Sequence, residues 1–366
     1  MKTVDEKNLK FDFFRSNNFD FIRLIAALQV ALVHGITHLE VEILNPFLDF
    51  LNLFPGVPIF FFLSGFLISA SWERNSNVKN FSLNRFYRIF PGLWGCVLFS
   101  IFLIFLFSFV LNENVYYLQL LYWILMQGTF FPQWNPDFLS WFGVGVVNGS
   151  LWTIPVELTF YLFLPLIYFV TSIYKIKLEY LLLFLALLSF FIFYLLINLQ
   201  FDSGVYLLLK KILMISFIPW IGMFCLGVLA QRYVEILHIY LANKVFLFLI
   251  LFFLISIMGI YYKIPVLFGS ANDIGILNYL VLCALVFSIG YSNPEFSDKF
   301  LQRNDISYGI YIYHMLIFNS LIMMDYLGFF SFILGILMTF LIASISWIYL
   351  ENPMLKRKKI SLYKRL

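Results

Sequence analysis

Apolar stretches close to twenty residues long recur along this chain, with short polar segments between them. A helix rises about 1.5 Å per residue, so each stretch is near the length that a hydrocarbon core about 30 Å thick requires. A membrane β-barrel would instead show short segments of alternating polarity. The pattern predicts an all-α, polytopic transmembrane helical bundle with about ten spanning helices. The stretches cover about residues 20–39, 54–71, 90–111, 151–174, 178–199, 212–230, 245–262, 274–291, 306–325 and 329–350.

The distribution of Lys and Arg predicts the direction of these helices, because basic residues favour the cytoplasmic side of a membrane. The N-terminal lead, residues 1–18, carries four basic residues, and residues 40–53 carry none. The tail, residues 351–366, is strongly basic. We therefore expect both termini in the cytoplasm. Three lysines fall on the outer side in this arrangement and weaken it: Lys210, Lys211 and Lys263.

A shorter aromatic stretch at 116–131 leaves two topologies open. If it crosses the membrane, Lys175 and Lys177 lie outside; if it re-enters or lies at the interface, they lie inside. The second topology keeps ten spans and makes residues 112–150 an extracytoplasmic or re-entrant region. We expect one membrane-embedded domain over residues 1–366.

Composition supports a membrane protein and supplies little other chemistry. The chain is 62% hydrophobic and 12% charged, which for a water-soluble domain would expose too much apolar surface. The cysteines, Cys96, Cys225 and Cys283, lie in separate apolar stretches without metal or redox spacing. We therefore expect membrane lipid as the surroundings, with no metal, no bound cofactor and no nucleic-acid partner.

The first apolar stretch contains ionisable side chains, which are costly in a bilayer and therefore mark candidate functional groups. Arg23 and His34 are eleven residues apart and share nearly one helix face, and His38 follows one turn later. A histidine satisfied by a helix carbonyl is the alternative. We interpret His34 as a candidate catalytic group and Arg23 as a substrate-lining group.

A carboxylate in the fourth stretch is predicted at a similar depth. Thr153 and Pro155 favour a helix start, which puts Glu157 about 6 Å from the outer end of that helix. His34 lies about 7 Å from the outer end of its own helix. A carboxylate beside an imidazole raises its basicity and holds one tautomer, so Glu157 is a second catalytic candidate. The alternative is that Glu157 simply favours the positive end of its helix.

Two arginines precede the third stretch. Arg85 and Arg88 are three residues apart, so on a helix they project to one side. They could bind phosphates bidentately, or they could be ordinary cytoplasmic anchors.

Other polar positions inside apolar stretches are candidates for lining a substrate path. Ser307, Tyr311 and His314 are spaced i, i+4, i+7 and form one polar stripe, which could equally be a packing feature. Ser64 precedes Gly65 in the second stretch, where small residues most simply allow close helix packing.

Taken in order, six elements of this sequence resemble the integral-membrane acyltransferase 3 family. The chain departs from the family at Pro155, where Ser is commoner, and at residues 19–22, where members often carry Asp-Gly. The resemblance agrees with the ten-helix prediction. The elements are Arg23 with His34, GVPIFFFLSGFLIS, RFYRIFP, SLWTIPVELTFYLFLPL, ISYGIYIYHMLI and the closing ENP.

The resemblance implies an O-acyltransferase that moves an acyl group, commonly acetyl, from cytoplasmic acyl-CoA to a hydroxyl acceptor. The acceptor would be a cell-surface polysaccharide or its lipid-linked precursor, a glycan or glycolipid. Acetyl-CoA would be the co-substrate, glycan-assembly proteins are possible partners, and the membrane would be the bacterial inner membrane.

The residues then suggest a mechanism. His34 would be the general base, or would carry the acyl group transiently, and Glu157 would orient it. Arg85 and Arg88 would hold the donor phosphates, about 20 Å from His34 if the two lie near opposite surfaces. The competing hypothesis is a glycan exporter or flippase without acyl chemistry, because intramembrane Arg, His and Glu also mark transport paths. Dependence on acyl-CoA distinguishes the two.

Overall fold

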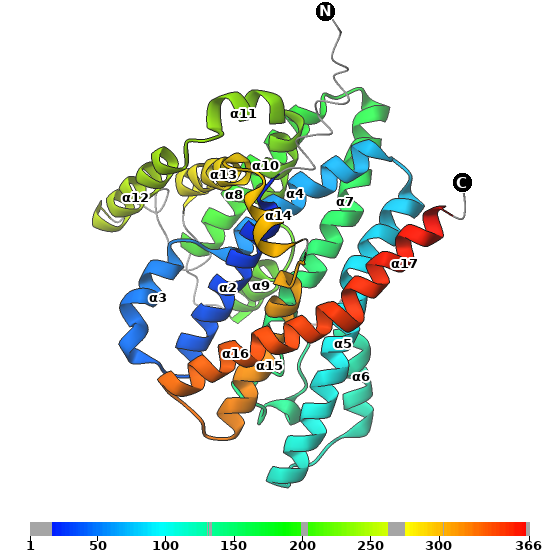
Figure 1. The fold of residues 1–366 in the computed structure, drawn as a ribbon, viewed down its shortest axis with the longest axis vertical. Helices are drawn as coiled ribbons and strands as arrows, with labels where there is room; N and C mark the ends of the chain where they lie inside the picture. Colours follow the sequence, from blue (N-terminus) through cyan, green and yellow to red (C-terminus); the bar gives the residue numbers. More distant parts are fainter. Residues whose placement is uncertain are drawn as a thin grey trace, which may run out of the picture. The chain divides into compact units, whose positions relative to one another are not determined.

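Helices account for all regular structure in the described part of the chain (Figure 1). The structure is a computed structural model. It describes residues 17–129, 131, 134–198, 204–262, 275–302 and 304–363. Most of the predicted N-terminal lead, the last three residues of the tail and Lys263 lie outside the described residues.

The chain groups into two compact units. Unit 1 comprises residues 1–26, 52–77 and 159–304, and unit 2 comprises residues 27–51, 78–158 and 305–366. Helix α2 (Phe19–His38) begins in unit 1 and ends in unit 2, and α7 (Thr153–Tyr174) begins in unit 2 and ends in unit 1.

The remaining elements fall within one unit or nearly so. Unit 1 holds α4 (Gly56–Arg74), α8 (Leu178–Asn198), α9 (Gly204–Met214), α10 (Ile221–Arg232), α11 (Val234–Leu241), α12 (Val245–Tyr262), α13 (Ile276–Tyr291) and α14 (Phe296–Leu301). Unit 2 holds nearly all of α3 (Asn45–Asn52), α5 (Val78–Leu111), α6 (Tyr117–Gln127), α15 (Ser307–Met323), α16 (Phe329–Ser346) and α17 (Asn352–Tyr363). It also holds the short turns η1 (Glu42–Leu44), η2 (Asp137–Leu139), η3 (Gly149–Trp152) and η4 (Trp347–Glu351).

The predicted fold class, an all-α membrane bundle, is confirmed. Within the described ranges, seven helical segments are long and apolar enough to cross a membrane. The number becomes eight if α10 and α11, which meet at a bend of 92°, are counted as one span. The count of ten spans and the cytoplasmic placement of both termini stay predictions.

Two predicted stretches differ in the structure. Helix α5 begins at Val78, whereas the predicted apolar stretch begins near residue 90. Pro91 lies inside this helix and removes one backbone donor, but it does not end the helix. Packing against α15 and α17 supports it there. The stretch predicted at 212–230 is divided: α9 ends at Met214, and α10 begins only at Ile221, after Pro219. Helix α10 is about 18 Å long, shorter than a hydrocarbon core.

In unit 1, α4 and α10 pack backbone against backbone. A Cβ atom on Gly65 would lie 2.0 Å from the Phe224 carbonyl oxygen, and one on Gly227 would lie 2.0 Å from that of Phe62. Such contacts require the absence of a side chain, so the packing interpretation holds for Gly65.

We expect Gly65→Ala to lower the free energy of unfolding by about 1–3 kcal/mol, because the added methyl group meets backbone that cannot rotate away. Gly204→Ala is the matched control, since a Cβ there meets nothing within 4 Å. Thermal unfolding of the detergent-solubilised variants measures the difference. Equal midpoints for the two variants would contradict this packing argument.

In unit 2, α15 forms the centre and is buried along most of its length. Helix α16 packs against it, and α16, η4 and α17 form one continuous helical rod (Figure 1). In the C-terminal half of α15, the buried Asn319 amide donates to the carbonyl oxygens of Val146 (2.9 Å) and Val147 (3.0 Å). This fixes the loop that leads into α7, which begins at Thr153 as predicted.

Candidate functional site

The predicted polar stripe on α15 lies inside unit 2. Ser307, Tyr311 and His314 are all buried, and each makes a side-chain hydrogen bond to a residue outside α15. The three residues follow one another along one face of the helix over about 10 Å. Helix α15 therefore carries a line of polar contacts through an otherwise apolar core.

Toward the C-terminus of α15, the line ends at a pair of histidines, His34 and His314. His34 Nδ1 and His314 Nε2 are 2.9 Å apart, and the two rings stack with centroids 5.1 Å apart. His314 is completely buried, whereas His34 is half-buried. The His38 ring lies 5.6 Å from that of His34. Sequence reasoning singled out both members of the pair but did not predict their contact.

The middle of the line joins α15 to the start of α7. Thr153 Oγ1 donates to the Tyr311 hydroxyl at 2.9 Å. Glu157 lies one turn further along α7, within electrostatic range of the Tyr308 and Tyr311 hydroxyls. The hydrogen-bond partner of His34 is His314. The predicted pairing of His34 with Glu157 therefore stays a prediction.

At the N-terminal end of α15 the line meets an ion pair between the half-buried Arg88 and the buried Asp305. Arg88 Nη2 donates to Asp305 Oδ2. Asp305 Oδ1 accepts from the Ser307 hydroxyl and, at 3.2 Å, from the Ser307 backbone N–H. Asp305 thus supplies an acceptor for the first backbone N–H of α15 and also pairs with the arginine. Sequence reasoning missed Asp305, although an Asp just before a helical stretch is a known start signal.

A second buried carboxylate lies in unit 2. Glu351 Oε1 accepts from the Ser346 hydroxyl at 3.0 Å, and Oε2 has no hydrogen-bond partner among the described residues. Glu351 ends a π-helical turn, η4, a local geometry that is frequent at functional sites. It acts electrostatically on Arg88. The ENP element was noted in the sequence, but Glu351 was not assigned to the site.

The other predicted site residues have their own neighbours. The Arg85 guanidinium lies over the Phe81 ring, 5.8 Å from its centroid, on the same helix as Arg88. Arg23 pairs with Asp20 at 2.6 Å, one turn earlier on α2. Ser64 is half-buried on α4. The roles suggested for these three residues stay predictions.

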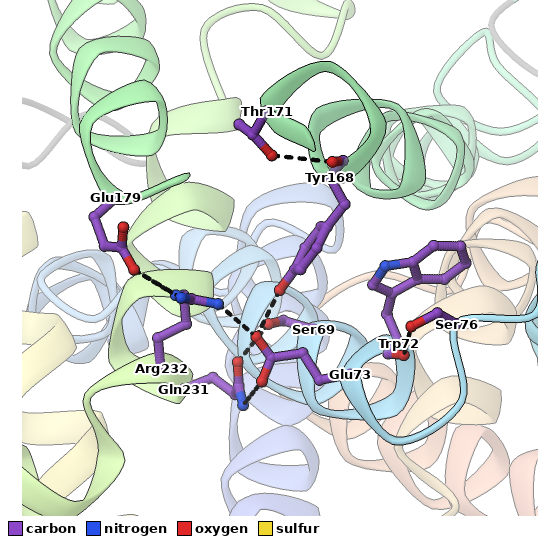
Figure 2. Close-up of polar contacts among 9 residues, drawn as sticks. All are labelled: Ser69, Trp72, Glu73, Ser76, Tyr168, Thr171, Glu179, Gln231 and Arg232. Carbon is purple, nitrogen blue, oxygen red and sulfur yellow. Dashed lines mark hydrogen bonds and ion pairs between the residues drawn. The ribbon is translucent and has the colours of Figure 1, made fainter. Parts of the chain in front are cut away.

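Unit 1 contains a separate polar cluster, which Figure 2 shows. Glu73 on α4 is its centre and accepts from Arg232 Nη1 (2.8 Å), the Tyr168 hydroxyl (2.8 Å) and Gln231 Nε2 (3.0 Å). The same arginine also pairs with Glu179 on α8 at 2.7 Å. The cluster ties α4, α7, α8 and α10 together, and Arg232 bridges its two carboxylates, Glu73 and Glu179. We therefore treat it as a structural tie.

Fold and site together define a class: a helical membrane protein with a line of polar contacts along one buried helix. No group of three or more potential metal ligands occurs among the described residues. The chain belongs to the acyltransferase 3 family, whose model, described as an acyltransferase domain, matches residues 16–350. It is an integral-membrane O-acyltransferase.

Relatives support the same class. Nodulation protein 10 of Rhizobium leguminosarum bv. viciae is 30% identical over 367 residues, which cover 96% of each chain. An O-acetyl transferase of Shigella phage Sf6 is 34% identical over 153 residues, 40% of this chain and 44% of that protein. Peptidoglycan O-acetyltransferase OatA of Listeria monocytogenes serovar 1/2a is 28% identical over 118 residues, 31% of this chain and 19% of that protein. No solved structure matches the chain.

Proposed function

We propose that this enzyme transfers an acetyl group from cytoplasmic acetyl-CoA to a hydroxyl of a cell-surface polysaccharide or its lipid-linked precursor. The names of two relatives, an O-acetyl transferase and a peptidoglycan O-acetyltransferase, support acetyl as the group and a glycan as the acceptor. The observation that carries the proposal is the line of contacts on α15, which begins at Arg88 and ends at His34.

The length of that line suits a long, thin donor. Ser307, next to the Arg88–Asp305 pair, and His314, which contacts His34, are seven residues apart and thus about 10 Å apart along α15. The sequence estimate of about 20 Å assumed that Arg88 and His34 lie near opposite membrane surfaces. With its phosphates at Arg88, and with Arg85 nearby on α5, a pantetheine arm can extend along α15 toward the histidines. Arginine suits the phosphates because its guanidinium binds them bidentately.

The proposed chemistry is acyl transfer with His34 as the general base. A neutral imidazole takes the proton of the acceptor hydroxyl as the oxygen attacks the thioester carbonyl carbon. The C–O bond forms, the C–S bond breaks, and the leaving thiolate takes the proton back from the imidazolium. If His34 instead carries the acetyl group, its nitrogen attacks the thioester carbon, a C–N bond forms and the C–S bond breaks. The hydroxyl then attacks the acetyl-imidazole, the C–O bond forms, the C–N bond breaks, and the released thiolate takes the hydroxyl proton.

In this proposal Glu157 stabilises from a distance the positive charge that develops on His34. Its carboxylate is within electrostatic range of the Tyr311 hydroxyl, and the Tyr311 ring lies 6.0 Å from His314. In a medium of low dielectric constant, a carboxylate still favours a positive imidazolium over several ångströms.

A donor assay tests the proposed function. Membranes from the organism that encodes this chain receive acetyl-CoA labelled in the acetyl group, and the glycan fraction is then separated. We expect label in the glycan together with release of the free CoA thiol, and neither in membranes that lack the protein. Lys299→Ala, which removes an exposed ion pair with Glu295, is the control and should label normally. Glycan that crosses the membrane without label would instead support the exporter hypothesis.

A further inference from the structure

We propose that His314 is a positioning residue that determines which ring nitrogen of His34 acts as the base. The pair would hold His34 as the tautomer with hydrogen on Nδ1, so that Nε2 receives the acceptor's proton. This inference rests on the proposed function, because it assigns an atom and a partner to the base named there.

The first step concerns the buried ring of the pair, that of His314. His314 Nδ1 lies 3.1 Å from the carbonyl oxygen of Ile310, one turn earlier on α15. A carbonyl oxygen can only accept a hydrogen bond, so Nδ1 of His314 must carry the hydrogen. A neutral imidazole has one donor and one acceptor, and Nε2 of His314 is then the acceptor.

The neutral form of His314 follows from its surroundings. The side chain is completely buried, and its ring contacts are aromatic: Tyr311 at 6.0 Å and Phe318 at 5.9 Å. A charge without a counter-ion is costly in such a place. The second nitrogen of His314 therefore accepts.

The second step concerns His34, whose tautomer follows from the accepting nitrogen of His314. His34 Nδ1 is 2.9 Å from the accepting Nε2 of His314, so it must be the donor in this hydrogen bond. In neutral His34 the hydrogen is then on Nδ1 and the lone pair is on Nε2. His34 keeps some exposure, whereas the His314 side chain has none.

The arrangement also favours the transition state. When Nε2 of His34 takes the hydroxyl proton, the ring becomes positive while Nδ1–H continues to donate to His314. A hydrogen bond with a charged donor is roughly twice as strong as a neutral one. His314 gains no proton in the cycle, and the proton on His34 Nε2 leaves with the thiolate.

Nitrogen-15 NMR of the histidine-labelled protein in lipid bilayers reads the tautomer directly. The chain contains four histidines, so single replacements of His38 and His238 identify the two signals of the His34–His314 pair, and the His314 variants below tell these two apart. We expect His34 to show a protonated Nδ1 and an unprotonated Nε2, and His314 to show the same pattern. A wild-type His34 with its hydrogen on Nε2 overturns the inference.

Two variants of His314 separate positioning from packing. His314→Leu keeps the bulk but removes the acceptor, so we expect the His34 Nδ1–H signal to lose its wild-type form. We expect kcat to fall by about 10²-fold with the KM for acetyl-CoA unchanged. His314→Gln supplies an amide oxygen that can accept from His34, so the signal and most of the activity should return. Equal loss in both folded variants overturns the positioning role.

The outcomes also distinguish this inference from the proposed function. If His34→Ala abolishes transfer but the wild-type spectrum shows hydrogen on His34 Nε2, only the assignment of atoms is wrong. If the spectrum is as expected but His34→Ala transfers acetyl normally, acetyl transfer itself stands, but His34 is not the base, and the inference built on that role fails.

Discussion

His34→Gln is expected to lower kcat for acetyl transfer by about 10²- to 10⁴-fold, the usual contribution of a general base. The reason is chemical, because an amide has no lone pair basic enough to accept the hydroxyl proton. The amide N–H can still donate to His314 Nε2, so the buried partner keeps its hydrogen bond. The KM for acetyl-CoA should remain near the wild-type value, because the proposed function places the donor phosphates at the other end of α15. Initial rates of CoA thiol release measure both constants.

His34→Ala is the companion variant and separates stability from chemistry. It removes the base and also leaves the buried Nε2 of His314 without a donor, which costs about 1–3 kcal/mol of stability. We therefore expect both variants to be inactive, but only the alanine variant to unfold at a lower temperature. His238→Asn lies in unit 1 and serves as the unaffected control. Wild-type kcat in the glutamine variant would remove His34 from the mechanism.

The sequence predicts the class of fold and several local features of the site. Long apolar stretches predict membrane helices directly, and Thr153 with Pro155 correctly marks the start of α7. Spacing alone also places Ser307, Tyr311 and His314 on one face, and the structure buries all three. These features are local, so neighbouring residues suffice to predict them.

The contact between His34 and His314 could not be predicted in this way. His34 lies fifteen residues after the first residue of α2, about 22 Å, and His314 lies only seven after that of α15, about 10 Å. An argument that starts every helix at one membrane level places these rings far apart and pairs His34 with Glu157 instead. Tertiary packing sets the levels at which helices start, and spacing along one helix carries no information about it.

Two further differences do have signals in the sequence. Pro219 disfavours helix in the residue before it, which agrees with the gap between α9 and α10 inside one predicted stretch. Pro91, by contrast, lies inside α5, where neighbouring helices support the chain. A proline therefore marks a possible break, and tertiary contacts decide whether the break occurs. Asp305, whose carboxylate accepts from the first backbone N–H of α15, is a missed start signal of the same local kind.

Arg88→Ala is expected to lower the free energy of unfolding by about 3–5 kcal/mol, because it leaves the buried Asp305 carboxylate without its partner. Loss of activity in this variant alone would therefore not show that Arg88 binds the donor. The double variant Arg88→Ala/Asp305→Asn removes both charges. The asparagine oxygen can still accept from the Ser307 N–H, so the first backbone N–H of α15 keeps its acceptor.

The double variant should recover most of the lost stability but not the affinity for the donor. A hydrogen bond to a charged group contributes about 1.5–3 kcal/mol, so we expect the KM for acetyl-CoA to rise about 10- to 100-fold. Asp305→Asn alone keeps the guanidinium and should keep a KM close to wild type. Chemical denaturation and initial rates on the same preparations provide the two measurements. If the double variant regains both stability and a wild-type KM, Arg88 serves only as the counter-ion of Asp305. The donor phosphates must then be held elsewhere, with Arg85 on the same helix as the next candidate.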